Sequence, residues 1–387
     1  MINRLYYSIT FLILLHSSCL KEETEIISNS TSQSFIFEEG GCKVITGEIN
    51  ENYTISANEC YKLRGNTHIS AGVTLTIESG ATITAIPYSK PTYLSVRQGG
   101  QIIANGTVDQ PIIFTHEDMQ PESWSGLHIN GNAPTNKNGG SSQGLENTGY
   151  YGGNNPQDNS GVLNYVIIKY CGEELENGFN SNGLNLNAVG SETDVDFVQI
   201  YNCKNDGLKI NGGNVDVNHL VVTHIDQDCV DLEYGWQGSG NNWYIEQIDE
   251  VGSDEAIQID NDETSPEVTP VTNINLNNVT IIGFGEESAI RFRSNSKGLL
   301  NNILINNFAL GIEITGTYCN LSVVNDEILF TNLSINNCAV SHQHTPSIAD
   351  PSLVGIEDKV SSWFTNPGTG CGEEYGDGWM SNWTLSF

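Results

Sequence analysis

The chain has 387 residues, of which 38% are hydrophobic, and its 47 acidic against 15 basic side chains give a formal net charge of −32. The scarcity of Lys and Arg argues against nucleic acid as a partner, the charged fraction of 16% argues against long charged helices, and the frequent Val and Ile argue against disorder throughout. What remains is a large, acidic, strand-rich protein whose charge opposes binding to an anionic surface unless cations intervene.

The N-terminus predicts export. Arg4 precedes an apolar stretch, residues 5–15, that is shorter than the roughly 20 residues of a membrane-spanning helix, so residues 1–18 are predicted to be a signal peptide. Residues 16–19 (HSSC) resemble a lipobox, in which Cys19 becomes the lipidated first residue of the mature protein, although His16 stands where leucine is usual. The alternative is plain secretion with Cys19 unmodified.

The residues after Cys19 predict where the protein is held. Residues 20–23 (LKEE) resemble the sequence that directs bacteroidete lipoproteins to the outer cell surface, and residues 19–34 are polar enough to form a flexible tether. We therefore expect a protein that acyl chains on Cys19 anchor in the cell outer membrane, facing the extracellular side.

Cysteine usage predicts disulfides. Eight cysteines remain without Cys19, and an even number in an exported protein favours disulfide pairing, with Cys42 and Cys60 as a plausible local loop. No CxxC pair occurs, so a structural zinc site of that kind has little support.

From about residue 61 onward, short β-branched runs alternate with Asn, Gly and Asp turns. A small residue followed by apolar-x-apolar recurs at Gly183, Gly207, Cys229, Ala256, Ala289 and Gly311, in steps of 24, 22, 27, 33 and 22 residues. A second apolar-x-apolar run interleaves with it, and its last copies are framed by asparagines, as in residues 301–307 (NNILINN). A repeat of about 22 residues with several short strands is typical of a solenoid, in which stacked coils bury a shared apolar interior.

We therefore predict an all-β fold, a right-handed single-stranded parallel β-helix of about ten coils, rather than a β-propeller, whose blades need about 40–50 residues. The β-helix with its N-terminal cap is predicted over residues 35–345. Residues 346–387, with Trp363, Trp379 and Trp383, are predicted to cap the last coil, an alternative being an aromatic platform for carbohydrate. The Gly/Asn-rich loop 136–161 is long enough to be functional or mobile.

Several stretches resemble secreted bacteroidete β-helix proteins of the pectin-lyase-like type. They are residues 75–83 (LTIESGATI), 104–107 (ANGT), 110–115 (QPIIFT) and 151–161 (YGGNNPQDNSG). The resemblance spans most of the chain after residue 35, and it implies the fold and an exported location.

Stacking the repeats places acids at one corner. Aligned copies superimpose Asp206, Asp228 and Asp254 or Glu255, and carboxylates about 5 Å apart repel unless they are protonated or bridged by a cation. One hypothesis is a Ca²⁺ site at Asp226, Asp228 and Asp254, because calcium takes several oxygen ligands. The other is a glycosidase, which needs one carboxyl group as acid and one as base.

The glycosidase hypothesis has a local resemblance behind it. Residues 205–207 (NDG), 227–230 (QDCV) and 291–293 (RFR) resemble motifs of polygalacturonase-type hydrolases. The resemblance implies that Asp206 and Asp228 are catalytic carboxylates and that Arg291 and Arg293 hold a substrate carboxylate. One aspartate of the usual motif is missing, however, and residues 254–256 (DEA) replace the usual Gly-His-Gly.

Further residues complete the predicted sites. Lys209, Asp231 and Trp236 are predicted to contact substrate, and a polysaccharide lyase is an alternative that would need a base and a cation or Arg beside the uronate. The motif His342-Gln343-His344 puts two imidazoles on one face of a strand, but with no third ligand in sight we interpret them as loop histidines.

Together these features predict a surface lipoprotein that binds, and helps to degrade, an extracellular acidic polysaccharide, alongside glycan-uptake partner proteins and with Ca²⁺ as its cofactor. A lyase or polygalacturonase-like hydrolase is the first alternative. A structural or adhesive surface protein without catalysis is the second.

Overall fold

The computed structural model describes residues 35–385 apart from 176–177, 249–252, 286, 346–353 and 373. The predicted signal peptide, Cys19 and the tether lie outside the described residues. Within them, no helix is long and apolar enough to cross a bilayer.

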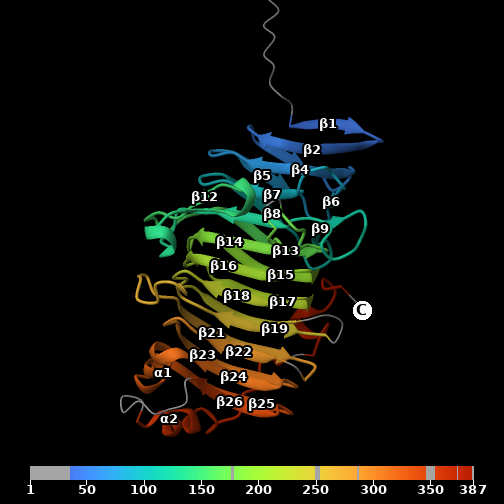
Figure 1. The fold of residues 1–387 in the computed structure, drawn as a ribbon. Coiled ribbons are helices and arrows are strands. Elements are labelled where there is room, and N and C mark those ends of the chain that lie inside the picture. The colour runs from blue at the N-terminus through green and yellow to red at the C-terminus, as the bar shows by residue number, and fades with distance from the viewer. Residues whose placement is uncertain are drawn as a thin grey trace, which may run out of the picture. The chain divides into compact units, whose positions relative to one another are not determined.

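The chain winds into a column of stacked coils, the parallel β-helix that its repeats predict (Figure 1). Coil stacks on coil through two long parallel ladders, which we call the straight ladder and the bent ladder. The straight ladder runs through β4 (Tyr61–Ile69), β7 (Tyr93–Val96), β10 (Leu127–Asn130), β14 (Leu184–Val189), β16 (Leu208–Gly213), β18 (Val230–Glu233), β20 (Ile257–Ile259), β22 (Ser288–Phe292), β24 (Leu310–Thr315) and β26 (Val340–Thr345).

The bent ladder holds the longer strands. It runs through β13 (Gly161–Lys169), β15 (Asp194–Cys203), β17 (Val217–Ile225), β19 (Ser239–Glu246), β21 (Asn273–Ile282), β23 (Lys297–Asn306) and β25 (Ile328–Asn336). β13 also pairs with the shorter strands β8 (Gln101–Asn105) and β9 (Ile112–His116).

The column starts and ends differently. At its start lie β1 (Ile36–Glu39), which pairs antiparallel with β2 (Cys42–Ile49), then β3 (Tyr53–Ile55), β5 (Thr74–Ile77) and β6 (Thr82–Ala85). Toward its end lie α1 (Gly316–Val324) and α2 (Ile356–Trp363). The long loop carries the hairpin β11 (Ser142–Gln143) and β12 (Tyr150–Tyr151) and two short 3₁₀ turns (Lys137–Gly139 and Leu145–Asn147), and a third such turn (Gly378–Met380) lies in the tail.

Alternation along the strands builds the core. In the straight ladder, Leu184 lies over Leu208 and Leu208 over Val230, and all three are fully buried. The residues between them, such as Lys209 and Asp231, point outward in a second file. A period of two along each strand therefore becomes one apolar column inside and one polar column outside.

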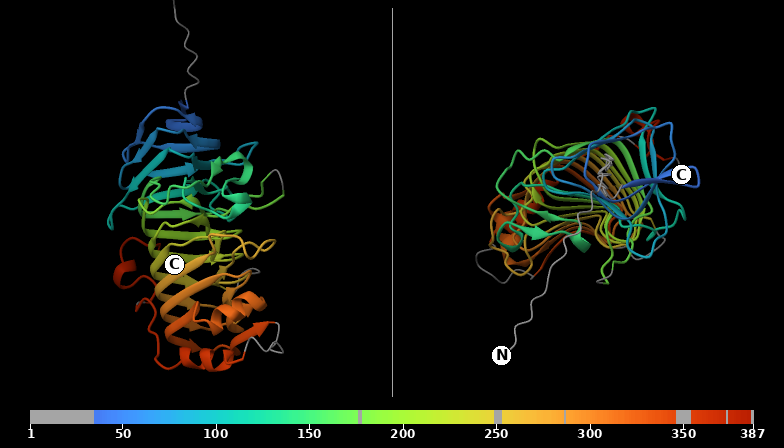
Figure 2. Two further views of the ribbon diagram at one scale, coloured as in Figure 1. Left: turned by 90° about the vertical axis from the view of Figure 1, so that its left-hand side faces the viewer. Right: turned by 90° about the horizontal axis from the view of Figure 1, so that it is seen from above.

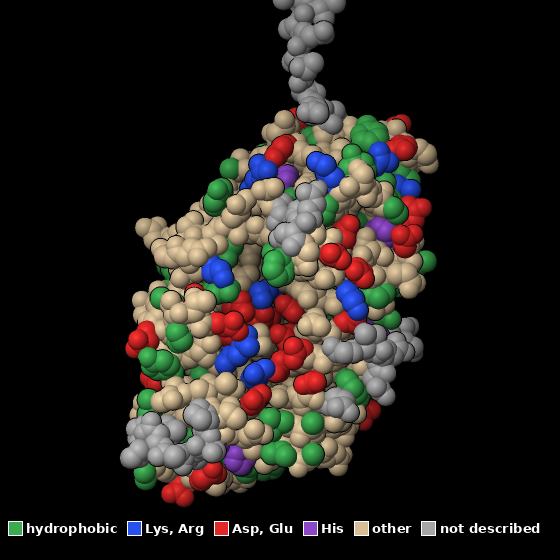
Figure 3. Space-filling model, viewed as in Figure 1, with side chains coloured by type: hydrophobic (Ala, Val, Ile, Leu, Met, Phe, Trp, Pro, Cys, Tyr) green, Lys and Arg blue, Asp and Glu red, His purple; other side chains and the backbone are tan. Residues whose placement is uncertain are grey.

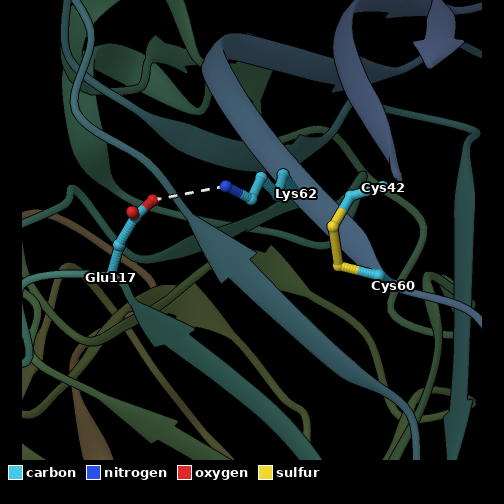
Figure 4. The surroundings of a disulfide bond; sticks show 4 residues. All are labelled: Cys42, Cys60, Lys62 and Glu117. Carbon is cyan, nitrogen blue, oxygen red and sulfur yellow. Dashed lines mark hydrogen bonds and ion pairs between the residues drawn. A yellow bond between two sulfur atoms is a disulfide. The ribbon is translucent and has the colours of Figure 1, made fainter. Parts of the chain in front are cut away.

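The cysteines depart from the expected pairing. Cys42 and Cys60 form the disulfide, which ties the first coil near the ion pair of Lys62 with Glu117 (Figure 4). Four further cysteines, Cys171, Cys203, Cys229 and Cys319, are buried and form no disulfide. Cysteine behaves there as a small apolar side chain that fills the interior of a coil.

The tail covers more than the last coil. α2 packs at the end of the column, where Trp363 lies 4.8 Å from Phe330 between ring centroids. Beyond it the chain runs back along the bent ladder: Thr369 binds Asn302, Tyr375 binds Gln199, and Trp383 packs on Tyr165 (Figure 2). α2 therefore lies at the end of the column, whereas the rest of the tail is a strap along the side.

Candidate functional site

The outward face of the straight ladder carries the polar side chains that the repeats bring together. One file of paired positions contains His128, Asn185, Lys209, Asp231, Gln258, Arg291, Glu313 and Gln343. Figure 3 shows acidic and basic side chains gathered in the middle of this face, below a hollow.

That hollow is a cavity of about 330 Å³. Its floor is β14 and β16, its wall is the long loop, and asparagines supply much of its polar surface: Asn180, Asn182, Asn185, Asn187, Asn205 and Asn211. Phe179, Tyr151 and Tyr234 add aromatic rings, and Lys137 lies with its Nζ 3.5 Å from the ring centroid of Tyr234. We call this space the cavity.

The wall of the cavity is fixed by hydrogen bonds to distant coils. The Asn136 side-chain amide donates to Asn261 Oδ1 at 2.7 Å and to Pro270 O at 2.9 Å. Asn130 likewise donates to Thr148 O at 3.1 Å. A long loop that is bonded in this way forms a preformed wall, as binding sites usually have.

A lysine and three carboxyl groups meet at the edge of the cavity. Lys209 Nζ forms an ion pair with Asp231 and lies 3.4 Å from Glu233 Oε2 and 3.7 Å from Asp206 Oδ2. Burial raises the pKa of Asp206 to about 7 and that of Glu233 to about 8, against the opposing effect of Lys209. Burial alone would lower the pKa of Lys209, but its three carboxylates raise it, so the lysine stays charged.

A second acidic group lies one coil further on. Asp228, Asp254 and Glu255 each present an oxygen within 4.8 Å of the others. Burial, then the charge of Asp206, raises the pKa of Asp228 well above its ordinary value, and burial with the contact to Asp254 raises the pKa of Glu255 to about 7. We call these three residues the oxygen cluster.

The oxygen cluster fits a calcium ion better than the predicted set did. Glu255 Oε2 is buried without a hydrogen-bond partner, and an all-oxygen donor set is what Ca²⁺ prefers. Asp226, which the sequence suggested as a ligand, points elsewhere and binds Lys204 Nζ at 2.8 Å. Glu255, named from the sequence only as an alternative to Asp254, takes its place.

The structure brings Asp206 and Asp228 together, as stacking predicts. Leu208 pairs with Val230, and Gly207 N donates to Asp228 O at 3.0 Å, so the two aspartates occupy equivalent corners of adjacent coils. Lys209 and Asp231 lie on the same face, beside them.

The arginines are already engaged. Arg291 donates to Glu255 Oε1 at 2.8 Å and also pairs with Glu313 at 3.3 Å. Arg293 donates to Asp260 Oδ2 at 2.6 Å and pairs with Glu263. Holding a substrate carboxylate would therefore mean breaking internal ion pairs.

The prediction that Trp236 contacts substrate is wrong. Its side chain is fully buried, and its indole N–H donates to Val215 O at 3.0 Å. A large apolar ring with a satisfied N–H belongs to the core. The aromatic side chains of the cavity, Phe179, Tyr151 and Tyr234, were missed, and the length of loop 136–161 was a signal for Tyr151 alone.

A parallel β-helix with a polar cavity on one outer face defines the class of this protein. The chain belongs to the pectate-lyase-like β-helix domain family, whose model matches residues 47–384. That family places it among polysaccharide-active or polysaccharide-binding proteins. No curated protein and no solved structure showed significant similarity to the chain.

Proposed function

We propose that this protein is a surface lipoprotein that binds an extracellular acidic polysaccharide in the cavity, with Ca²⁺ held by the oxygen cluster. The observation that carries the proposal is a preformed cavity with an asparagine floor, one coil away from the oxygen cluster, in which Glu255 Oε2 has no hydrogen-bond partner. The membrane anchor and the glycan-uptake partners belong to the same proposal and rest on residues 1–34.

The floor of the cavity suits sugar hydroxyl groups. Side-chain amides carry both donors and acceptors, as hydroxyl groups do, so a row of asparagines can bond a sugar from either side. Asn187 Nδ2 already donates to Asn130 Oδ1 at 2.9 Å, and Asn211 Nδ2 donates to Asn187 Oδ1 at 2.7 Å. This chain of bonds fixes the amides in place before a ligand arrives, which reduces the entropy cost of binding.

A cation explains how so acidic a protein can hold an acidic glycan. With a formal net charge of −32, the protein repels a uronate unless positive charge intervenes. Lys209, Arg291 and Arg293 are neutralised by their own carboxylate partners. Three protein oxygens leave several positions on Ca²⁺ for water and for the glycan carboxylate.

Hydrolysis is the second candidate function, and the pKa of Asp206 favours it. At neutral pH a carboxyl group with a pKa of about 7 is partly protonated and can donate that proton to the oxygen of a glycosidic bond. Both Asp206 Oδ2 and Glu233 Oε2 lie within 3.7 Å of Lys209 Nζ, so the two oxygens are at most about 7 Å apart, a limit compatible with the roughly 5–5.5 Å of retaining glycosidases. Asp228, one coil away, is the other candidate partner. A lyase would use a base at the same place.

Affinity electrophoresis tests binding. The purified chain should be retarded in gels that contain polygalacturonate and Ca²⁺, and retarded much less with EGTA or with a neutral glucan. Asp254→Asn should weaken the calcium-dependent retardation at least tenfold, whereas Asp109→Asn, an exposed loop residue far from the cluster, should leave it unchanged. Equal mobility in all gels would overturn the binding proposal.

Product analysis separates binding from catalysis. New reducing ends without ultraviolet-absorbing products indicate hydrolysis, and ultraviolet-absorbing unsaturated ends indicate a lyase. Asp206→Asn should remove the products of hydrolysis and keep retardation. Retardation with no product of either kind supports a binding protein, and the hydrolysis proposal would then fall.

A further inference from the structure

From β7 to β24 the interior positions of the straight ladder are apolar, and the last coil departs from this pattern. The interior position that is Ile290 in β22 and Ile312 in β24 becomes His342 in β26. The next interior position, Phe292 and then Ile314, becomes His344. Isoleucine would serve better if burial under a cap were the only requirement, because an imidazole costs free energy where it lacks partners.

A third polar group faces these imidazoles from the cap. Glu357, in the first turn of α2, brings its Oε2 to 3.6 Å from His342 Nε2. One ligand atom of each of His342, His344 and Glu357 lies within 4.8 Å of the others. The sequence offered only the two histidines of a His-x-His motif, because Glu357 reaches them through the fold.

The hydrogen bonds of His344 leave one ring nitrogen available. The Asn320 amide, oriented by its donation to Thr345 O at 3.5 Å, presents Oδ1 to His344 Nδ1 at 3.1 Å. Since an amide oxygen only accepts, Nδ1 carries the proton and Nε2 carries the lone pair. His344 is 9% exposed, and its Nε2 is buried with no hydrogen-bond partner.

This is the arrangement of a metal-binding histidine. Such residues typically donate their other N–H to an oxygen, which fixes the ring and its tautomer.

We propose that His342, His344 and Glu357 form a Zn²⁺ site that joins the cap helix α2 to the last strand β26. Bonds of about 2.0–2.2 Å in a tetrahedral geometry place ligand atoms roughly 3.4 Å apart, close to the 3.6 Å between His342 and Glu357. The remaining separation closes by side-chain rotation, because the Glu357 side chain is 64% exposed. Three protein ligands leave a fourth position for water.

The proposed zinc site is independent of the proposed calcium site. It lies at the end of the column and offers two nitrogens and one carboxylate, a set that favours zinc over calcium. The oxygen cluster lies on the outer face and offers carboxylates alone. Failure of one proposal therefore leaves the other standing.

Calorimetric titration of the metal-free full chain with Zn²⁺, in the presence of excess Ca²⁺ to occupy the oxygen cluster, tests the proposal. We expect one equivalent to bind and the melting temperature to rise by several degrees. Co²⁺ in place of Zn²⁺ should give visible absorption of the intensity typical of four-coordinate sites.

Variants assign the ligands. Glu357→Gln, at an exposed position that should fold normally, is expected to weaken Zn²⁺ binding at least tenfold, and His344→Gln should abolish the stoichiometric phase. Asp358→Asn is the matched control, because it removes an acid from the next position of the same helix and should change nothing. No zinc binding to the parent chain, or unchanged binding in both Glu357→Gln and His344→Gln, would overturn the proposal.

Discussion

Asp206 and Asp228 are forced together by the coil spacing of about 4.8 Å, which leaves little room for water between stacked side chains. Burial raises the pKa of both, and also raises that of Glu233 and Glu255. At the residue scale the candidate site is therefore a place where acids keep their protons near neutral pH. Such perturbed groups are concentrated at functional sites.

These pKa values predict how stability depends on pH. In the unfolded chain Asp206, Glu233 and Glu255 lose their protons near their ordinary values of 3.8 and 4.5, but in the folded protein they keep them to about 7 or 8. The folded state binds more protons in that window, so the free energy of unfolding should fall as pH rises from about 4 to about 8. Thermal melts across this range, in EGTA, measure it.

Replacing Asp206 isolates the contribution of one carboxyl group to this pH dependence of stability. Asp206→Asn should flatten the fall of unfolding free energy by up to about 1.4 kcal/mol per pH unit, the value for one proton. The exposed Asp109→Asn should leave the slope as it is in the parent chain. If stability instead rises from pH 5 to pH 8, these carboxyl groups are ionised in the folded state.

At the scale of the element, the bent ladder depends on one column of residues with positive φ. Each long strand bends at such a residue: Tyr165, Phe197, His219, Asn242, Asn278, Asn302 and Asn332. The first three stack ring on ring, with centroids 4.3 and 4.2 Å apart. Asparagine takes over afterwards, because it tolerates this conformation and can hydrogen-bond to its neighbour in the next coil.

Asn302 joins this column to the strap. Its Nδ2 donates to Asn278 Oδ1 and to Gly370 O, both at 2.8 Å, and its Oδ1 accepts from Thr369 N at 2.7 Å. Asn302→Ala removes these bonds and leaves alanine at a φ of 61°. We expect a loss of about 2 kcal/mol and faster proteolysis within the strap, measured by melting and limited digestion.

A matched change shows whether the loss is specific. Asn275→Ala alters an exposed asparagine of the neighbouring strand β21, which accepts one bond from Asn277. It should cost less than about 0.5 kcal/mol. Equal losses for both variants would mean that the column of asparagines has no special role.

At the scale of the whole molecule, the column is one compact unit that starts at Phe35. The membrane anchor that we propose at Cys19 precedes this unit in the sequence, so removing the anchor should leave the fold intact. Cys19→Ser should abolish acyl labelling and move the protein from the membrane fraction into the medium, without changing its melting temperature. Cys338→Ser, which alters an unpaired cysteine of the column, should stay in the membrane fraction. A Cys19→Ser protein that remains in the membrane would contradict lipidation.

The amino-acid sequence by itself determined the repeat, the interior and exterior faces of the strands, the corner that Asp206 and Asp228 share, and the Cys42–Cys60 pair. These follow from periodicity and from short separations along the chain, which local sequence records. Trp236 was misassigned because the sequence around a tryptophan beside an acidic segment does not show whether its side chain faces the core or the solvent.

Only the tertiary structure decided which distant groups meet. The loop that walls the cavity, the exchange of Asp226 for Glu255, the path of the strap and the approach of Glu357 to His342 all depend on how far each insertion shifts the coil above. The repeat pattern does not encode these shifts, because each irregular turn forms hydrogen bonds with the coil that packing brings next to it.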